Sequence, residues 1–203
     1  MNYILLQDEI NLIKDSDKRN IIISFLKSAP DYIEHVSASS SGKYHPSFDH
    51  GEGGLIRHIK MTVAVAQDLI RLENYDFVCN CDNLVYPEDM SVSYSKKEFM
   101  DNVIAACLLH DIYKNGYEDS NRTVFAHPAI AAYEFRNFID KIIEETKSHS
   151  MITKLEKFKN EVADAVETHM GQWCIHKPKN RLEKIVHLAD YISSRKFFDK
   201  FKD

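Results

Sequence analysis

Histidine and aspartate stand side by side at the end of the most apolar stretch of this 203-residue chain. His110 and Asp111 follow residues 103–109, which carry no charge, and Lys114 comes three residues after the aspartate. Burying a carboxylate costs several kcal/mol unless a positive group meets it, and a divalent cation would hold both side chains at once. Taken alone, the pair favours a plainer interpretation. A histidine at a helix C-terminus interacts with the helix dipole, and the aspartate then caps the next turn.

Four further residues extend the pair into a set that could ligate metal. Each lies in a different predicted helix, at its end or on its apolar face, and they are His58, His127, His169 and Asp190. Imidazole nitrogens and carboxylate oxygens are the donors that divalent metals such as Mn²⁺, Fe²⁺ and Zn²⁺ take. Each residue singly would more often be a hydrogen-bonded structural side chain. The set as a whole indicates a metal site, and Asp111 could bridge two ions.

Helices must position these residues, and the sequence has helical periodicity throughout. Apolar residues recur three and four positions apart, and no segment alternates with period two, so we predict an all-α fold. Glycine and histidine make residues 43–54 a predicted loop, and composition makes residues 37–42 a predicted flexible linker. The polar residues 74–97 are expected to form a long connection. The expected helices are residues 4–13, 17–27, 55–72, 99–109, 129–143, 153–169 and 182–198.

Length and composition limit the organisation and the class of the protein. With 44% hydrophobic and 28% charged residues, the chain can bury one sizeable core. We expect residues 1–42 to form N-terminal helices that pack on or extend a helical domain spanning residues 43–203. Their apolar faces allow two roles, closing the core or forming a homodimer interface. An early acidic N-terminus, no apolar run of membrane-spanning length and no CxxC pair predict a cytoplasmic protein without a membrane partner.

Five motifs, in order along residues 44–195, resemble those of the HD-domain metal-dependent phosphohydrolases. The first is a glycine pair followed by a helix with a histidine, Gly-Gly-Leu-Ile-Arg-His58. The second is the His110-Asp111 signature with its lysine three residues later. The five segments are residues 53–58, 109–114, 127–128, 167–171 and 188–192.

The resemblance implies a single helical HD-type domain whose metal site is built from several helices. It implies that one metal is held by His58, His110, Asp111 and Asp190, and a second by Asp111, His127 and His169. We therefore expect two divalent ions, of Mn, Fe, Ni, Zn or Mg, that activate a water molecule for attack on phosphorus. Asp111 and Lys114 are the expected catalytic residues, with the lysine stabilising charge on the phosphoryl oxygens.

The chain departs from the family pattern at one position. Related two-metal members often carry two consecutive histidines where this chain has His169-Met170, and a thioether suits these metals poorly. Met170 therefore argues against a third ion and weakens the case for the second. No Gly-Tyr-Pro motif lies near His127, so we do not infer cleavage of cyclic dinucleotides.

Several residues beside the expected ligands could contact a substrate, although packing or a solvated surface is the commoner role for each. Lysine and arginine could pair with phosphate, and an aromatic side chain such as that of Trp173, Tyr117 or Phe125 could stack on a base. The substrate-binding candidates are His45, His50, Arg122, Trp173, Lys177 and Lys179. The expected partner is a phosphate-bearing small molecule or a nucleic-acid end. The glycine-pair opening resembles exonuclease-type branches, whereas the net charge of −5 favours a small nucleotide.

Two alternatives to a two-metal phosphohydrolase stay open. One is a one-metal nucleotidase or triphosphohydrolase that uses only His58, His110, Asp111 and Asp190. The other is a catalytically silent HD scaffold that binds a nucleotide or a protein partner.

Overall fold

The computed structural model of the protein describes residues 1–72 and 96–201, and the expected connection at residues 74–97 lies almost wholly outside them. Every regular element of the described residues is helical, so the all-α prediction is confirmed. The longer helices are α2 (Ser16–Ser28), α3 (Gly54–Leu72), α4 (Lys96–Leu109), α5 (His127–Glu145), α6 (His149–Thr168) and α7 (Arg181–Ser193). The shorter ones are η1 (Tyr3–Leu6), α1 (Gln7–Ile10), η2 (Asp31–Glu34), η3 (Ser47–Asp49), η6 (Gly171–Trp173) and η7 (Lys196–Phe201). None of the helices in this described part is long and apolar enough to cross a membrane.

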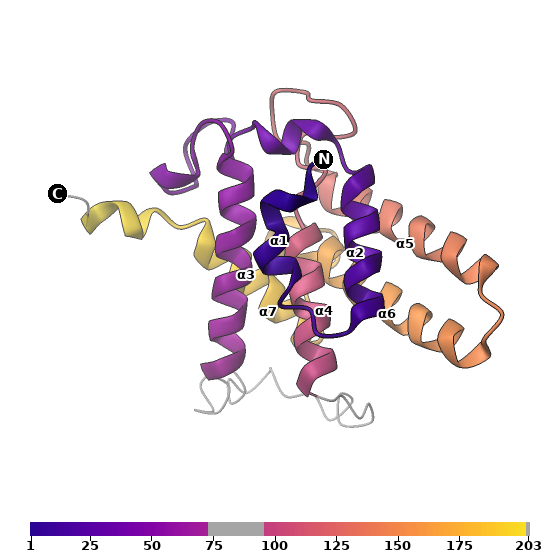
Figure 1. Cartoon of the computed structure of the whole chain (residues 1–203). Helices are drawn as coiled ribbons and strands as arrows, with labels where there is room; N and C mark the ends of the chain where they lie inside the picture. The colour runs from indigo at the N-terminus through magenta and orange to yellow at the C-terminus, as the bar shows by residue number, and fades with distance from the viewer. Residues whose placement is uncertain (73–95, 202–203) are drawn as a thin grey trace.

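Helix α4 lies at the centre of the bundle, where it contacts α3, α6, α7 and the N-terminal helices α1 and α2 (Figure 1). Its residues 103–109 are at most 1% exposed. Neighbours on every side explain this apolar run, because a helix buried all round needs no polar face. His110 and Asp111 follow directly, so the central helix delivers both to the middle of the fold.

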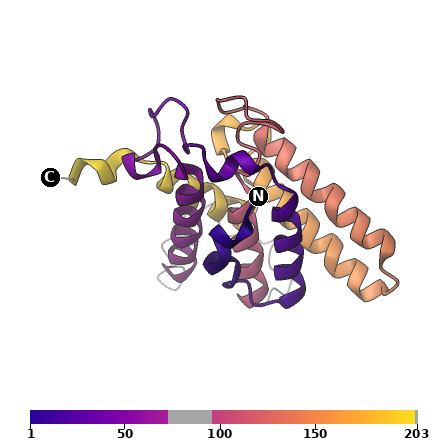
Figure 2. The same cartoon turned by 45° about the horizontal axis from the view of Figure 1, so that its top comes forward.

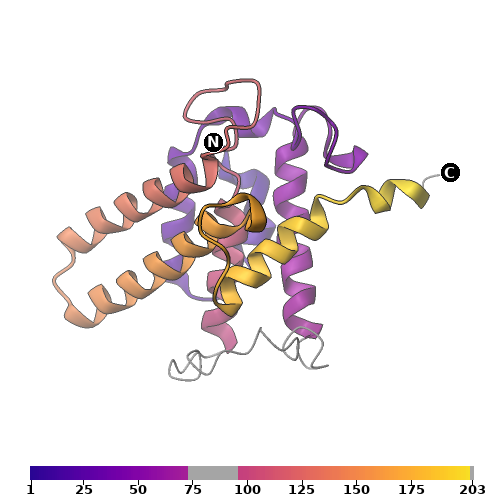
Figure 3. The same ribbon diagram turned by 180° about the vertical axis from the view of Figure 1, so that it is seen from behind.

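The other helices bury one stripe each and enclose α4. Along α3 the residues Leu55, Ile59, Val63 and Ile70 are buried, spaced as one face of a helix requires. Helices α5 and α6 pack along each other as a hairpin, and α7 crosses α3, α4 and α6 (Figure 3). Helices α3, α6 and α7 therefore pack directly on α4, and α5 packs on α6.

The N-terminal segment packs into the same hydrophobic core as the later helices (Figure 2). Leu6, Ile10 and Ile22 are fully buried within it. The buried Asp101 of α4 fastens this segment, because its carboxylate accepts from the backbone N–H groups of Lys14 and Asp15 at 2.8 and 2.9 Å. The division of the chain at residue 42 and the homodimer interface stay predictions.

Several helix boundaries differ from those expected from periodicity. The helix predicted over residues 4–13 is a 3₁₀ turn followed by one α-helical turn. The last helix ends at Ser193 instead of residue 198. Hydroxyls explain this end, because Ser193 Oγ donates to the carbonyl of Ala189 and Ser194 Oγ donates to that of Tyr191. Such side-chain bonds compete with the backbone ladder.

The prediction of a flexible linker over residues 37–42 is wrong. Ala38 is fully buried, and its backbone N–H donates to the carbonyl of Asp49 at 3.0 Å. Ser37 Oγ donates to the same carbonyl. Serine-rich composition suggested flexibility, but these small side chains let the segment pack closely against the loop that precedes α3.

Candidate metal centre

The six ligand-type residues come together where α3, α4, α5, α6 and α7 meet. Asp190 lies within α7, and His58 lies near the start of α3. The remaining four lie at helix ends: His110 and Asp111 directly after α4, His127 as the first residue of α5, and His169 directly after α6. Helix ends leave backbone groups free for side chains, which explains why residues so distant in sequence can be oriented there.

The first cluster consists of His58, His110 and Asp190, whose potential ligand atoms all lie within 4.8 Å of one another. His58 Nε2 lies 3.0 Å from Asp190 Oδ1 and 3.2 Å from His110 Nε2. Both histidines are fully buried, and the carboxyl side chain of Asp190 is 18% exposed. The side chains thus present two nitrogens and one oxygen to a common point.

The second cluster consists of Asp111, His127 and His169. Asp111 Oδ1 lies 2.9 Å from His127 Nε2 and 3.6 Å from His169 Nε2, and the two Nε2 atoms are 3.4 Å apart. All three residues are buried. The donors have the same chemistry as those of the first cluster.

Asp111 connects the two clusters through its two carboxylate oxygens. Oδ1 faces the second cluster, whereas Oδ2 lies 3.6 Å from His58 Nε2 and 3.5 Å from His110 Nε2 of the first. Lys114 Nζ donates to Oδ2 as well. A single carboxylate therefore stands between two sets of nitrogen donors, as a bridging ligand would.

Three of the four histidines are oriented by the same kind of hydrogen bond to a nearby backbone carbonyl. The Nδ1 atom of His110 lies 2.7 Å from the carbonyl of Cys107, and His127 and His169 make the equivalent contact to Val124 and Val166 at 2.7 and 2.8 Å. Each carbonyl belongs to the residue three positions earlier, at a turn or helix end. Nδ1 must carry the proton in this contact, so Nε2 presents a lone pair to the cluster.

Electrostatics keep most of these groups in the form that binds metal. Burial lowers the pKa of His110 to about 3 and also lowers the pKa of His127, so both are neutral near pH 7. Burial alone would raise the pKa of Asp111, but Lys114 and the surrounding histidines hold it well below its ordinary value. The pKa of Asp190 is likewise low despite burial, because His58 donates to it. Both carboxylates are therefore ionised.

His58 is the exception. Burial would lower its pKa, but the hydrogen bond to Asp190 and the nearby carboxylate of Asp49 raise it to about 9. A metal ion that binds at the first cluster must therefore displace the proton on His58 Nε2.

One contact in the second cluster indicates a divalent cation without reference to any related protein. Asp111 Oδ1 is buried and accepts no hydrogen bond from the described residues, although His127 Nε2 lies 2.9 Å away. The His127 ring has its proton on Nδ1, so two acceptors face each other. A cation between them removes the conflict, and histidine nitrogen with carboxylate oxygen suits Mn²⁺, Fe²⁺ and Zn²⁺.

The candidate substrate residues divide into buried and exposed ones. His45 is buried beside His58, with ring centroids 4.5 Å apart, and His50 Nε2 lies 3.1 Å from the carbonyl of His45. Trp173 is 63% exposed in η6, and Arg122 and Lys179 are also exposed.

Lys177 differs from the other predicted phosphate contacts. Its ammonium group donates to the carbonyls of Gln172 and Cys174, at 2.6 and 3.2 Å, and so ties together the loop after α6. His187 of α7 places Nδ1 2.7 Å from the carbonyl of His169. Its ring leaves no room for a Cβ at Gly171, which has a φ of 57°.

Asp49 is the buried residue beside this centre that the sequence analysis missed. It is fully buried in η3, and with His45 and His58 it forms a third cluster of potential ligand atoms. In the sequence it is one more acidic residue in a loop rich in glycine and histidine. No local signal separates it from the others.

Comparison with known proteins identifies one family. The family model of the HD domain matches residues 55–195, which contain all six ligand-type residues. No curated protein and no solved structure matches the chain.

Proposed function

This chain belongs to the HD-domain superfamily of metal-dependent phosphohydrolases, and we propose that it cleaves a phosphoester of a nucleotide or a short single-stranded nucleic acid. The observation that carries the proposal is the position of Asp111. Its two oxygens face two separate sets of histidines, an arrangement suited to a pair of ions. Phosphohydrolases use such pairs on the attacking and leaving oxygens of a displacement at phosphorus.

Each cluster would hold one divalent cation, and Asp111 would serve both. The first would use His58, His110 and Asp190, and the second His127 and His169. When bound, the cations supply Lewis acidity towards a phosphoryl oxygen and lower the pKa of a water molecule. His110, His127 and His169 contribute by presenting unprotonated Nε2 atoms in fixed positions, whereas His58 would first lose its Nε2 proton.

Lys114 has two proposed roles in this centre. It keeps Asp111 ionised by donating to Oδ2, and the residue as a whole is 7% exposed, so it lies at the wall of the centre. With a substrate present, the same group would pair with a phosphoryl oxygen and stabilise the charge that develops there.

The surroundings favour a small nucleotide or a single-stranded end over a duplex. The net charge of −5 gives the protein little general attraction for polyphosphate backbones. Phe125 precedes His127 by two positions and Trp173 follows His169 by four, and they are 66% and 63% exposed. Exposed aromatic rings near the ligands offer surfaces on which a nucleobase could stack.

The test combines metal analysis with turnover. Protein purified without chelator should contain about two equivalents of Mn, Fe, Ni or Zn per chain. The loaded protein should hydrolyse members of a panel of nucleotides, phosphodiesters and short single-stranded oligonucleotides, and chelation should abolish that activity. One bound equivalent, with turnover retained by His127→Ala, would favour the one-metal nucleotidase. Full metal loading without turnover on any member would favour the silent scaffold.

A further inference from the structure

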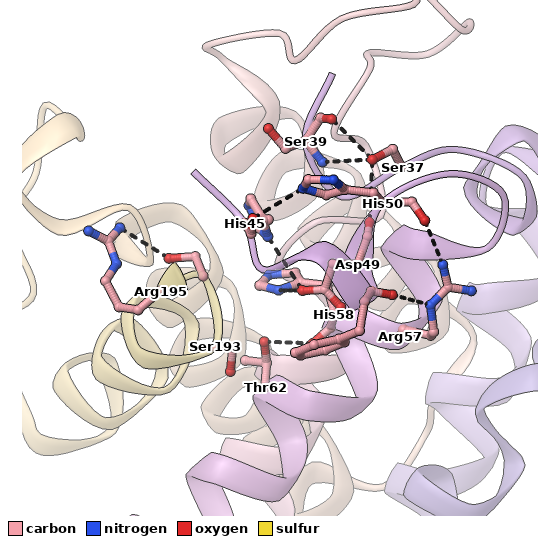
Figure 4. A network of polar contacts seen from close by, with 12 residues as sticks. Ser37, Ser39, His45, Asp49, His50, Arg57, His58, Thr62, Ser193 and Arg195 are labelled. Carbon is pink, nitrogen blue, oxygen red and sulfur yellow. Dashed lines mark hydrogen bonds and ion pairs between the residues drawn. The ribbon is translucent and has the colours of Figure 1, made fainter. Parts of the chain in front are cut away.

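Behind the candidate metal centre lies Asp49, a fully buried carboxylate whose nearest donors, the Nδ1 atoms of His45 and His58, lie just beyond hydrogen-bond distance. Its Oδ2 atom lies 3.6 Å from Nδ1 of His58 and 3.6 Å from Nδ1 of His45, and Figure 4 shows both rings turned towards it. An ionised carboxylate in such a place needs donors. The two imidazole N–H groups are the donors within reach.

The loop around Asp49 is built to hold it there. A Cβ at Gly54 would lie 2.0 Å from the Asp49 carbonyl oxygen, so the loop passes directly over the start of α3. Arg57 on the helix donates to the carbonyls of Phe48 and Glu52 in the loop. It also donates to the carbonyl of His50 (Figure 4). On the other side of the loop, the backbone N–H of Ala38 donates to the carbonyl of Asp49. These contacts fix the loop, and they therefore fix the Asp49 carboxylate next to His58.

His58 needs this partner for a reason that follows from its place in a helix. Each of the other three histidines donates a hydrogen bond from Nδ1–H to the carbonyl of the residue three positions earlier, at a turn or helix end. The equivalent carbonyl for His58 is that of Leu55, which lies inside α3 and is used in the helical ladder. A partner for Nδ1 must then come from outside the helix, and Asp49 is placed to be it.

We propose that Asp49 is a positioning residue. Its carboxylate accepts a hydrogen bond from the Nδ1–H group of His58 and so orients Nε2 towards the first cluster. The same carboxylate holds His45, whose ring packs edge-on against His58. Carboxylates placed behind a histidine ligand fix its tautomer and raise its basicity, and losing one typically costs ~10–100-fold in metal affinity. The inference rests on the proposed function, because it assumes that His58 ligates metal.

A separate ion held by His45, Asp49 and His58 explains the geometry less well. His58 already turns Nε2 to Asp190 and His110. To bind a second ion through Nδ1 it would have to lose both ring protons, whereas a neutral imidazole keeps one. Two N–H groups that share one carboxylate require no such step.

The experiment measures metal affinity in Asp49→Asn and Asp49→Ala by competition with a chromophoric chelator. Both variants should bind the first equivalent of Mn²⁺ or Zn²⁺ ~10–100-fold more weakly than the parent protein. The matched control is Asp199→Asn, because Asp199 holds the same loop by accepting from Ser47 N–H and Oγ at 2.9 Å each. Its affinity should equal that of the parent. Circular dichroism and melting curves verify the fold, and Asp49→Asn, which preserves side-chain shape, decides the matter if Asp49→Ala fails to fold.

An NMR signal from the His58 ring distinguishes a specific effect of Asp49 on His58 from a general loss of structure in the loop. In the Zn²⁺-loaded protein the His58 Nδ1 proton should give a strongly downfield resonance that Asp49→Asn moves upfield and Asp199→Asn does not. Unchanged affinity and an unchanged resonance in a folded Asp49→Asn variant would overturn the inference and leave the proposed function standing. A parent protein that binds three equivalents, of which Asp49→Asn loses one while the other two keep their affinity, would also overturn it, because a separate ion would then occupy the cluster of His45, Asp49 and His58. A parent protein that binds no metal would instead refute the proposed function.

Discussion

The Oδ1 atom of Asp111 lies 2.9 Å from Nε2 of His127, and neither atom has a proton to share. The ring proton of His127 is committed to the carbonyl of Val124, and the carboxylate is ionised. Two lone pairs at this distance repel each other, and a cation between them would remove that repulsion. This contact, 16 residues apart in the sequence, is the clearest sign that the protein is organised around a cation.

Replacing Asp111 by Asn should remove both metal equivalents. The amide is a weak ligand and cannot bridge two ions by charge, so turnover should fall by more than ~100-fold, beyond the usual effect of an outer partner. Elemental analysis and steady-state kinetics check this. If Asp111→Asn kept either equivalent at parental affinity, the shared-ligand arrangement would be wrong.

Replacing His127 or His169 by Ala should remove one equivalent only, because the first cluster keeps His58, His110 and Asp190. Turnover should fall with the lost ion. The matched control is His149→Ala, whose exposed histidine begins α6 far along the helix from His169. Metal content is the measurement. Loss of both equivalents, or of none, would contradict two separable sites.

Replacing Lys114 by Met should lower kcat by ~100-fold, because the charge that stabilises the phosphoryl oxygens is lost. Metal content should stay the same or rise, since Oδ2 of Asp111 no longer pairs with an ammonium group. Kinetics and elemental analysis on the same preparation separate these effects. Parental kcat in a metal-loaded Lys114→Met would remove Lys114 from the mechanism.

The stability of the metal-free protein should fall as pH rises from 6.5 to about 9. The hydrogen bond to Asp190 and the nearby carboxylate of Asp49 raise the pKa of His58 from 6.5 to about 9 in the folded state. A raised pKa means that the folded protein holds this proton more tightly, so the stabilisation is complete below pH 6.5 and is lost as His58 deprotonates. The melting temperature should drop on the order of 5 °C across that range. His58→Gln should lose this dependence, and an unchanged slope in that variant would disprove the assignment.

Replacing Asp101 by Ala should destabilise the fold without affecting metal binding. Two partly buried backbone N–H groups lose their acceptor, which costs at most ~1–3 kcal/mol for each group that water does not reach. The matched control is Asp68→Ala, because Asp68 is exposed on α3 and its ion pair with Arg71 contributes little. Denaturant unfolding measures both. An Asp101→Ala variant as stable as the parent would mean that the N-terminal segment is held by apolar packing alone.

Local sequence determined the helices and the chemistry of the ligand set. Apolar spacing predicted α3 and α6, and an uncharged run identified the buried helix that ends in His110 and Asp111. These signals are local, because helical periodicity and capping depend on residues three or four positions apart. The ordered motifs pointed to the HD domain, and the family match over residues 55–195 confirms it.

Only the tertiary structure decided which donor faces which. The split of Asp111 between two clusters depends on how five helices cross, and the partner of His58 comes from a loop whose composition predicted nothing about Asp49. The packed segment around Ala38 was mistaken for a flexible linker for the same reason. Long-range contacts depend on packing and on the need to satisfy every buried polar group. The spacing of neighbouring residues does not predict either of these.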